Sequence, residues 1–172
     1  MSWIIYLVLA AFAMYLCYNL SALSLFGAPY SLSKTYYLFQ ERKSWQRFLF
    51  PIMMIGMGLL LLPAWLEISA LSPFMFTAFL AAGGIIFTGA APAFNNSQME
   101  NRVHTISAIF AATFALLWII LVAKLWWFII VWAVLISLVA LLTNTWKTSY
   151  VYWLETIAFL STFTSIIAFF IV

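Results

Sequence analysis

Charged side chains are scarce in this chain of 172 residues, of which Asp, Glu, Lys and Arg together make up 6%. An ordinary soluble domain devotes about a quarter of its residues to these four types, so the chain cannot cover a water-exposed surface. The net charge of +3 is also spread too thinly to form a patch that binds nucleic acid. What the chain has instead is 67% hydrophobic and 20% aromatic residues, and its expected surroundings are membrane lipid.

Groups that bind metals or act as nucleophiles are equally few, with one Cys, one His and no Asp. A single Cys17 excludes an intramolecular disulfide and a metal site built from cysteines. One His cannot form a conventional transition-metal site without ligands from elsewhere. No GxSxG turn positions a serine nucleophile. We therefore expect no metal and no cofactor, and the sequence does not favour an enzyme.

Long apolar runs dominate the remaining sequence. A membrane-spanning helix needs about 20 mostly apolar residues, and the strands of a membrane barrel would alternate polar and apolar residues, which these runs do not. The sequence therefore predicts an all-α fold, a single transmembrane domain over residues 1–172 with six transmembrane helices in one bundle. The predicted spans are residues 3–26, 48–66, 70–94, 103–123, 125–142 and 151–171.

Two of the connections between the predicted spans are unusual. Residues 27–47 form the only sizeable polar segment, which we expect at the lipid headgroups as an ordered connection, with Ser33 capping a short helix; a dedicated lipid-binding helix is the alternative. Residues 103–142 contain neither Gly nor Pro. One helix over this range would be about 60 Å long, twice the membrane thickness. Lys124, close to three tryptophans, predicts a turn at the membrane interface.

The basic residues predict the orientation, because Lys and Arg are retained on the cytoplasmic side. Six of the seven fall in residues 27–47, 95–102 and 143–150, and Lys124 is the exception. We therefore predict a protein integral to a bacterial inner membrane, with these three loops cytoplasmic and both termini extracytoplasmic. The six residues are Lys34, Arg42, Lys43, Arg47, Arg102 and Lys147.

Small residues recur at helical spacing along most of the spans. Such residues let helix backbones approach closely in lipid, so they indicate the faces that pack together. The predicted packing positions are Gly84, Thr88, Ala108, Ala111, Ser161 and Ser165.

Two titratable residues share these inward faces. His104 is four residues before Ala108, and Glu155 is three residues before Ala158, so each pair lies on one side of its helix. An ionisable group inside a membrane segment is a functional candidate by default. We predict that Glu155 pairs with His104 near the cytoplasmic surface, and the competing partners are Arg102, Asn95 and Asn96. The alternative is structural: Glu155 reaches water from its helix end, and His104 bonds a neighbouring helix.

Four short motifs carry a resemblance. In order, they begin at Ser31 (SLSKTYY), Gly89 (GAAPAF), Val103 (VH) and Trp153 (WLETIAF). In these the chain resembles uncharacterised integral membrane proteins of similar length that are associated with phages and prophages of Bacteroidetes-type bacteria. The resemblance implies a membrane protein and no particular activity, although two of the motifs contain His104 and Glu155.

A fainter similarity links the chain to the alkaline ceramidase superfamily, through a run of small residues followed by a histidine. The metal site of that family needs several His and an Asp, which this chain lacks. The similarity therefore implies no zinc site.

The sequence leaves three functions open. The first is a small transporter, channel or ligand-binding membrane subunit with His104 and Glu155 at its cytoplasmic mouth. The second is a non-catalytic protein of membrane interaction or assembly, possibly phage-encoded, which partners membrane lipid, a further copy of itself or another membrane protein. A hydrolase acting on lipid is third.

Overall fold

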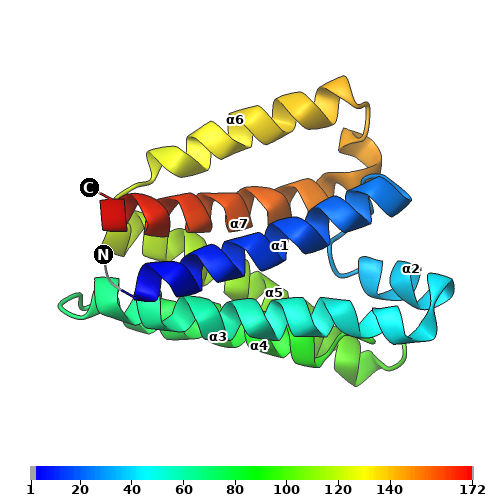
Figure 1. The fold of residues 1–172 in the computed structure, drawn as a ribbon, viewed down its shortest axis with the longest axis horizontal. Coiled ribbons are helices and arrows are strands. Elements are labelled where there is room, and N and C mark those ends of the chain that lie inside the picture. The colour runs from blue at the N-terminus through cyan, green and yellow to red at the C-terminus, as the bar shows by residue number, and fades with distance from the viewer. Residues whose placement is uncertain (1–2, 172) are drawn as a thin grey trace.

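The computed structural model describes residues 3–171, and within them all regular secondary structure is helical. Six helices run antiparallel along one axis, with α1 beginning and α7 ending at the same end of the bundle (Figure 1). The short helix α2 lies at the opposite end. In chain order the elements are α1 (Ile4–Phe26), α2 (Thr35–Arg42), the 3-10 helix η1 (Ser44–Phe48), α3 (Leu49–Ser69), α4 (Phe76–Ala90), α5 (Gln98–Trp118), the π-helix η2 (Ile119–Ala123), α6 (Trp127–Leu142) and α7 (Trp146–Ile171).

Four helical segments are long and apolar enough to cross a membrane: α1, η1 with α3, α5 with η2, and α7. This is the fold of an integral membrane protein built from helices. The expected spans at residues 70–94 and 125–142 contain the shorter apolar helices α4 and α6, of 15 and 16 residues. Helix length and composition thus support four of the six predicted crossings.

Local sequence explains why α4 and α6 are short. Pro92 follows α4, and a proline disfavours the helical conformation in the residue before it; Ala91 accordingly has φ −114° and ψ 57°. The chain breaks at Lys124, which adopts a left-handed conformation with φ 57° directly after the π-helix. Beyond the other end of α6, Asn144 has φ 54°, and Asn tolerates this conformation better than most residues. Helix α4 thus ends because of Pro92. Helix α6 is bounded by Lys124 and Asn144, which both have a left-handed backbone conformation.

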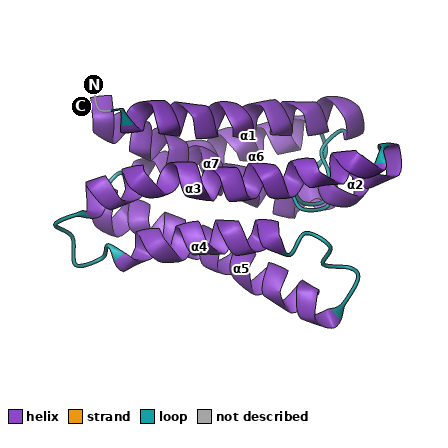
Figure 2. Ribbon diagram, turned by 60° about the horizontal axis from the view of Figure 1, so that its bottom comes forward, coloured by secondary structure: helices purple, strands orange, loops and turns teal. Residues whose placement is uncertain are grey.

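Helices α3, α4 and α5 pack closely together, with α4 and α5 side by side beyond α3 as seen from α1 (Figure 2). The closest approach of α4 to α5 is at Gly84, where an added Cβ would lie 2.6 Å from the backbone nitrogen of Ala111. Only a glycine leaves room for the backbone of α5 at this distance. By contrast, α6 packs mainly on α7 and stands away from α3 and α4 (Figure 1).

The other predicted packing residues lie on the inner faces of their helices. Thr88 is buried on α4, and its hydroxyl donates to the carbonyl of Gly84 at 2.7 Å. Ala111 is buried, whereas Ala108 is half-buried because it borders a cavity. Ser161 and Ser165 on α7 are fully enclosed, and neither hydroxyl has a hydrogen-bond partner.

The polar connection contains the short helix expected there, but the capping residue is different. Ser33 does not cap α2. Ser31 accepts a hydrogen bond from the backbone N–H of Lys34 at 3.2 Å and one of Ser31 and Ser33 donates to the other. The same N–H also donates to the carbonyl of Ser31 at 3.2 Å, so Ser31 stabilises the turn before α2, and no side chain caps the helix itself.

Candidate functional site

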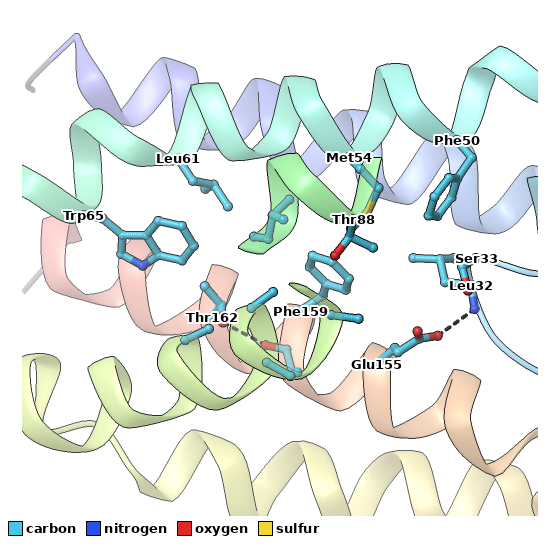
Figure 3. A pocket seen from close by; sticks show the side chains of 16 residues that line it. Leu32, Ser33, Phe50, Met54, Leu61, Trp65, Thr88, Glu155, Phe159 and Thr162 are labelled. Carbon is cyan, nitrogen blue, oxygen red and sulfur yellow. Dashed lines mark hydrogen bonds between the residues drawn. The ribbon is translucent and has the colours of Figure 1, made fainter. Parts of the chain in front are cut away.

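A cavity of about 60 Å³ lies where α3, α4 and α5 face α7. The segment Leu32–Ser33, between α1 and α2, borders it at one end, and Trp65 borders it at the other (Figure 3). Its lining along α3 extends from Phe50 to Trp65, roughly 22 Å at the rise of an α-helix. The cavity is therefore narrow and long. The remaining lining residues are Met54, Leu61, Ile85, Thr88, Ala108, Ala111, Ala112, Ala115, Glu155, Ala158, Phe159 and Thr162.

The walls are apolar except at a few points. The hydroxyls of Thr88 and Thr162 donate to carbonyls of their own helices, at 2.7 and 2.8 Å, so their hydrogens do not face a ligand. Ser33 and the carboxyl group of Glu155 stand together at the end near α2 (Figure 3). Glu155 is the only acidic or basic side chain in the lining.

The carboxylate of Glu155 is only partly satisfied by the protein. Its Oε2 accepts a hydrogen bond from the backbone N–H of Leu32 at 2.6 Å. No Lys, Arg or His of residues 3–171 pairs with it, and its Oε1 accepts no hydrogen bond from them. A carboxylate has about four lone-pair positions, so most of its capacity is unused. The side chain is half-buried and borders the cavity.

The contact with Leu32 is one of four hydrogen bonds that tie the start of the polar connection to α7, and another joins the hydroxyls of Tyr30 and Tyr150 at 3.0 Å. The hydroxyl of Ser149 donates to the carbonyl of Ala28 at 2.8 Å, and the N–H of Tyr152 donates to the carbonyl of Tyr30 at 3.0 Å. The backbone contact of Tyr152 requires the kink at Ser149, with φ −132° and ψ 25°, because in an unbroken helix the N–H of Tyr152 would bond residue 148. The kink thus fixes the segment that borders the cavity.

A buried polar network joins α1 to α7 near this end. The hydroxyl of Tyr152 donates to the side-chain oxygen of Asn19 at 2.6 Å, and the amide nitrogen of Asn19 donates to the hydroxyl of Tyr15 at 3.0 Å. All three side chains are buried. A buried network with satisfied members favours one arrangement of the helices, so α7 is held in a defined register against α1.

The far end of the cavity also has an unused polar group. Trp65 is fully enclosed, and its indole N–H has no hydrogen-bond partner. The neighbouring Trp118, which it contacts edge to face at 6.3 Å between ring centroids, does have one, since its N–H donates to Ser69 at 2.8 Å. An unpaired buried donor is uncommon in a native protein and calls for an explanation.

The predicted ion pair of His104 with Glu155 is not present. The Nδ1 atom of His104 is 2.9 Å from the carbonyl oxygen of Ala91, which it hydrogen-bonds, and the ring stacks on Phe94 with centroids 4.6 Å apart. His104 is buried but does not border the cavity. Pro92 ends α4 one residue after Ala91, which leaves this carbonyl available. The structural alternative thus describes the observed contacts of His104.

The three competing partners lie elsewhere as well. Asn95, Asn96 and Arg102 are all exposed. The backbone N–H of Asn95 donates to the hydroxyl of Tyr37 at 2.7 Å, which joins two of the polar loops. Burial raises the pKa of Tyr37 above its ordinary value, so this hydroxyl stays protonated near neutral pH.

Sequence reasoning identified Glu155 but missed the groups around it. Leu32 enters through its backbone, which no side-chain pattern reveals. Phe50, Trp65 and Phe159 look like ordinary apolar residues of a membrane helix. The signal that was available is the run Ala108, Ala111, Ala112 and Ala115, whose small side chains leave space along one face of α5.

Chemically, the arrangement is a slender apolar space with an unneutralised carboxylate at one end. Its lining also contains the hydroxyls of Ser33, Thr88 and Thr162. Comparison with family models, curated proteins and solved structures found no match.

Proposed function

We propose that this protein is a ligand-binding membrane subunit, of a transporter or a sensor, that takes up a small molecule in the cavity beside Glu155. The observation that carries the proposal is a carboxylate with unused hydrogen-bonding capacity facing an apolar space inside a membrane bundle. Ionisable groups are costly in a membrane, and those that persist commonly mark a substrate or ion pathway.

The proposal includes six crossings. Helices α4 and α6 are about 22 and 24 Å long at 1.5 Å per residue, against about 30 Å of hydrocarbon. Flanking apolar residues and local thinning of the bilayer accommodate a difference of this size at modest cost. All six long helices lie along one axis (Figure 1), which supports this topology.

The proposed orientation follows from the basic residues. Six of the seven lie at the end of the bundle where the polar connections run. By the positive-inside rule this end is cytoplasmic, in a bacterial inner membrane with both termini outside. Glu155 and the segment Leu32–Ser33 then stand near the cytoplasmic side, and ligand enters from there.

Cysteine accessibility tests the cavity. In a Cys17→Ser background, Ala158→Cys places a thiol in the lining, and Leu154→Cys places one on the outer surface of α7, where Leu154 is 55% exposed. The two positions are about one turn, or roughly 6 Å, apart along the helix. Thiols react as thiolates, which form in contact with water rather than lipid.

We expect a small cationic thiosulfonate reagent, 2-aminoethyl methanethiosulfonate, to modify Ala158→Cys much faster than Leu154→Cys in nanodiscs. The charged reagent reaches a cavity that opens to water, and lipid excludes it from the outer surface. Equal rates, or an unreactive Ala158→Cys, would show that the cavity is closed to ligands and would overturn the proposal.

A role in membrane assembly has support of a different kind. Helix α6 packs mainly on α7, and much of its remaining surface is exposed and apolar, including Val134 and Leu138. A second copy of the chain or another membrane protein could cover this surface. Lipid covers it equally well, so the cavity favours the ligand-binding function.

A further inference from the structure

We propose that the ligand is a slender organic cation, an ammonium group on a narrow alkyl chain, with the ammonium at Glu155 and the chain along α3 toward Trp65. The inference rests on the proposed function and names its ligand class. It follows from two features of the cavity: its charge and its shape.

Charge selects the head of the ligand. Glu155 has no cationic partner among residues 3–171, and only its Oε2 is hydrogen-bonded. A carboxylate in an apolar cavity is costly unless it is paired and hydrogen-bonded, and otherwise it takes up a proton. An ammonium group supplies a positive charge and up to three N–H donors to Oε1 and its surroundings. An anion would be repelled, and a neutral alcohol would leave the charge uncompensated.

The shape of the cavity selects the part of the ligand beyond the ammonium group. The cavity volume of about 60 Å³ is small for the length of its lining, so the cavity accepts only a molecule of narrow cross-section. The lining beyond Glu155 consists of alanine, leucine, isoleucine, methionine and aromatic side chains apart from two threonines with committed hydroxyls. A branched or bulky molecule would collide with these walls, whereas a single alkyl chain matches their width and polarity.

Trp65 and Glu155 lie at opposite ends of the lining (Figure 3). The proposed ligand uses the free hydrogen-bonding capacity at Glu155, and its alkyl chain points toward the apolar indole ring of Trp65, whose N–H has no partner among residues 3–171.

Hexylamine is the probe, and 1-hexanol and hexanoate are controls with the same chain and a neutral or negative head. The chain has four glutamates, Glu41, Glu67, Glu100 and Glu155, so protein labelled with ¹³C at glutamate carboxyls gives four resonances in nanodiscs. The resonance that disappears in Glu155→Gln identifies Glu155. The other three report whether each variant is folded.

We expect hexylamine, which is protonated near pH 7 as lysine is, to shift the Glu155 resonance in a saturable way and to leave the other three in place. Hexanol, hexanoate and sodium chloride at equal ionic strength should not shift it. Glu155→Gln should weaken hexylamine binding about ten- to a hundredfold, measured from line broadening of the amine, because a charge-assisted hydrogen bond is lost.

A cavity-filling variant localises the binding. Ala158→Phe fills the lining next to Glu155 and should abolish the response, whereas Leu154→Phe, on the outer surface of the same helix, should keep it. An equal response to hexanol, no response to hexylamine, or a response that survives in Ala158→Phe would overturn the inference. If one of these results is found and Ala158→Cys still reacts with the thiol reagent, the cavity is open to ligands and only the proposed ligand class is wrong. If Ala158→Cys does not react either, both proposals fail.

Discussion

Replacing Gly84 by alanine tests the contact between α4 and α5 on which one wall of the cavity depends. The new Cβ would lie 2.6 Å from the nitrogen and 2.8 Å from the Cα of Ala111, and 2.8 Å from the carbonyl oxygen of Ser107. All three are backbone atoms, so no side chain can rotate away and the two helices must separate. The expected cost of such overpacking is about 1–3 kcal/mol.

Gly83→Ala is a matched control on the same helix. A Cβ at Gly83 has no neighbour within 4 Å. Both substitutions gain the same helix propensity, up to about 1 kcal/mol. The difference between the two variants therefore isolates the contact, and we expect Gly84→Ala to be less stable than Gly83→Ala by about 1–3 kcal/mol.

The assay is reversible unfolding in mixed micelles by titration with sodium dodecyl sulfate, followed by circular dichroism. Gly83→Ala should match or exceed the parent protein in its free energy of unfolding. Equal free energies for the two variants would mean that α4 and α5 are not in backbone contact at Gly84, and the packing described above would be wrong.

Three further predictions follow from the other contacts. His104→Phe should lower the free energy of unfolding by about 1–3 kcal/mol, because the buried carbonyl of Ala91 loses its donor. The effects of His104→Phe and Glu155→Gln on this free energy should add to within about 0.5 kcal/mol in the double variant. A larger coupling energy would mean that the two side chains do interact. Ser149→Ala should cost about 0.5–1.5 kcal/mol through the lost contact with Ala28, and no change in the unfolding titration would show that this contact does not hold the connection. A cysteine in residues 95–102 should be labelled by a membrane-impermeant reagent only after the cells are opened, and labelling of intact cells would reverse the orientation.

The sequence predicts some of these features and not others, for physical reasons. Runs of apolar residues with almost no charge leave helices in lipid as the only reasonable fold, and the glycine at position 84 marks a close contact because small residues serve that role. The turn at Lys124 was predicted from the length of the apolar run and is confirmed, whereas the helix ends at Pro92 and Asn144 depend on local backbone effects that are not visible in hydropathy.

The candidate site, too, was predicted from the sequence only in part. Helical spacing identifies Glu155 as an inward residue, because periodicity reports which face of a helix a side chain occupies. It does not report the path of a connection, so the backbone N–H of Leu32 was not foreseen as its partner. His104 was placed correctly on an inner face, but its partner is a carbonyl freed by Pro92 rather than a carboxylate on another helix.

The central claim is that an organic cation occupies the cavity between Glu155 and Trp65. The most direct measurement is a crystal structure, grown in a lipidic mesophase, of the protein with 6-bromohexylamine, in which the anomalous signal of bromine locates the end of the chain. The account predicts ligand density inside the cavity, with nitrogen within hydrogen-bonding distance of Oε1 of Glu155 and bromine on the side toward Trp65. An empty or collapsed cavity, or bromine found only in the surrounding lipid, would contradict it.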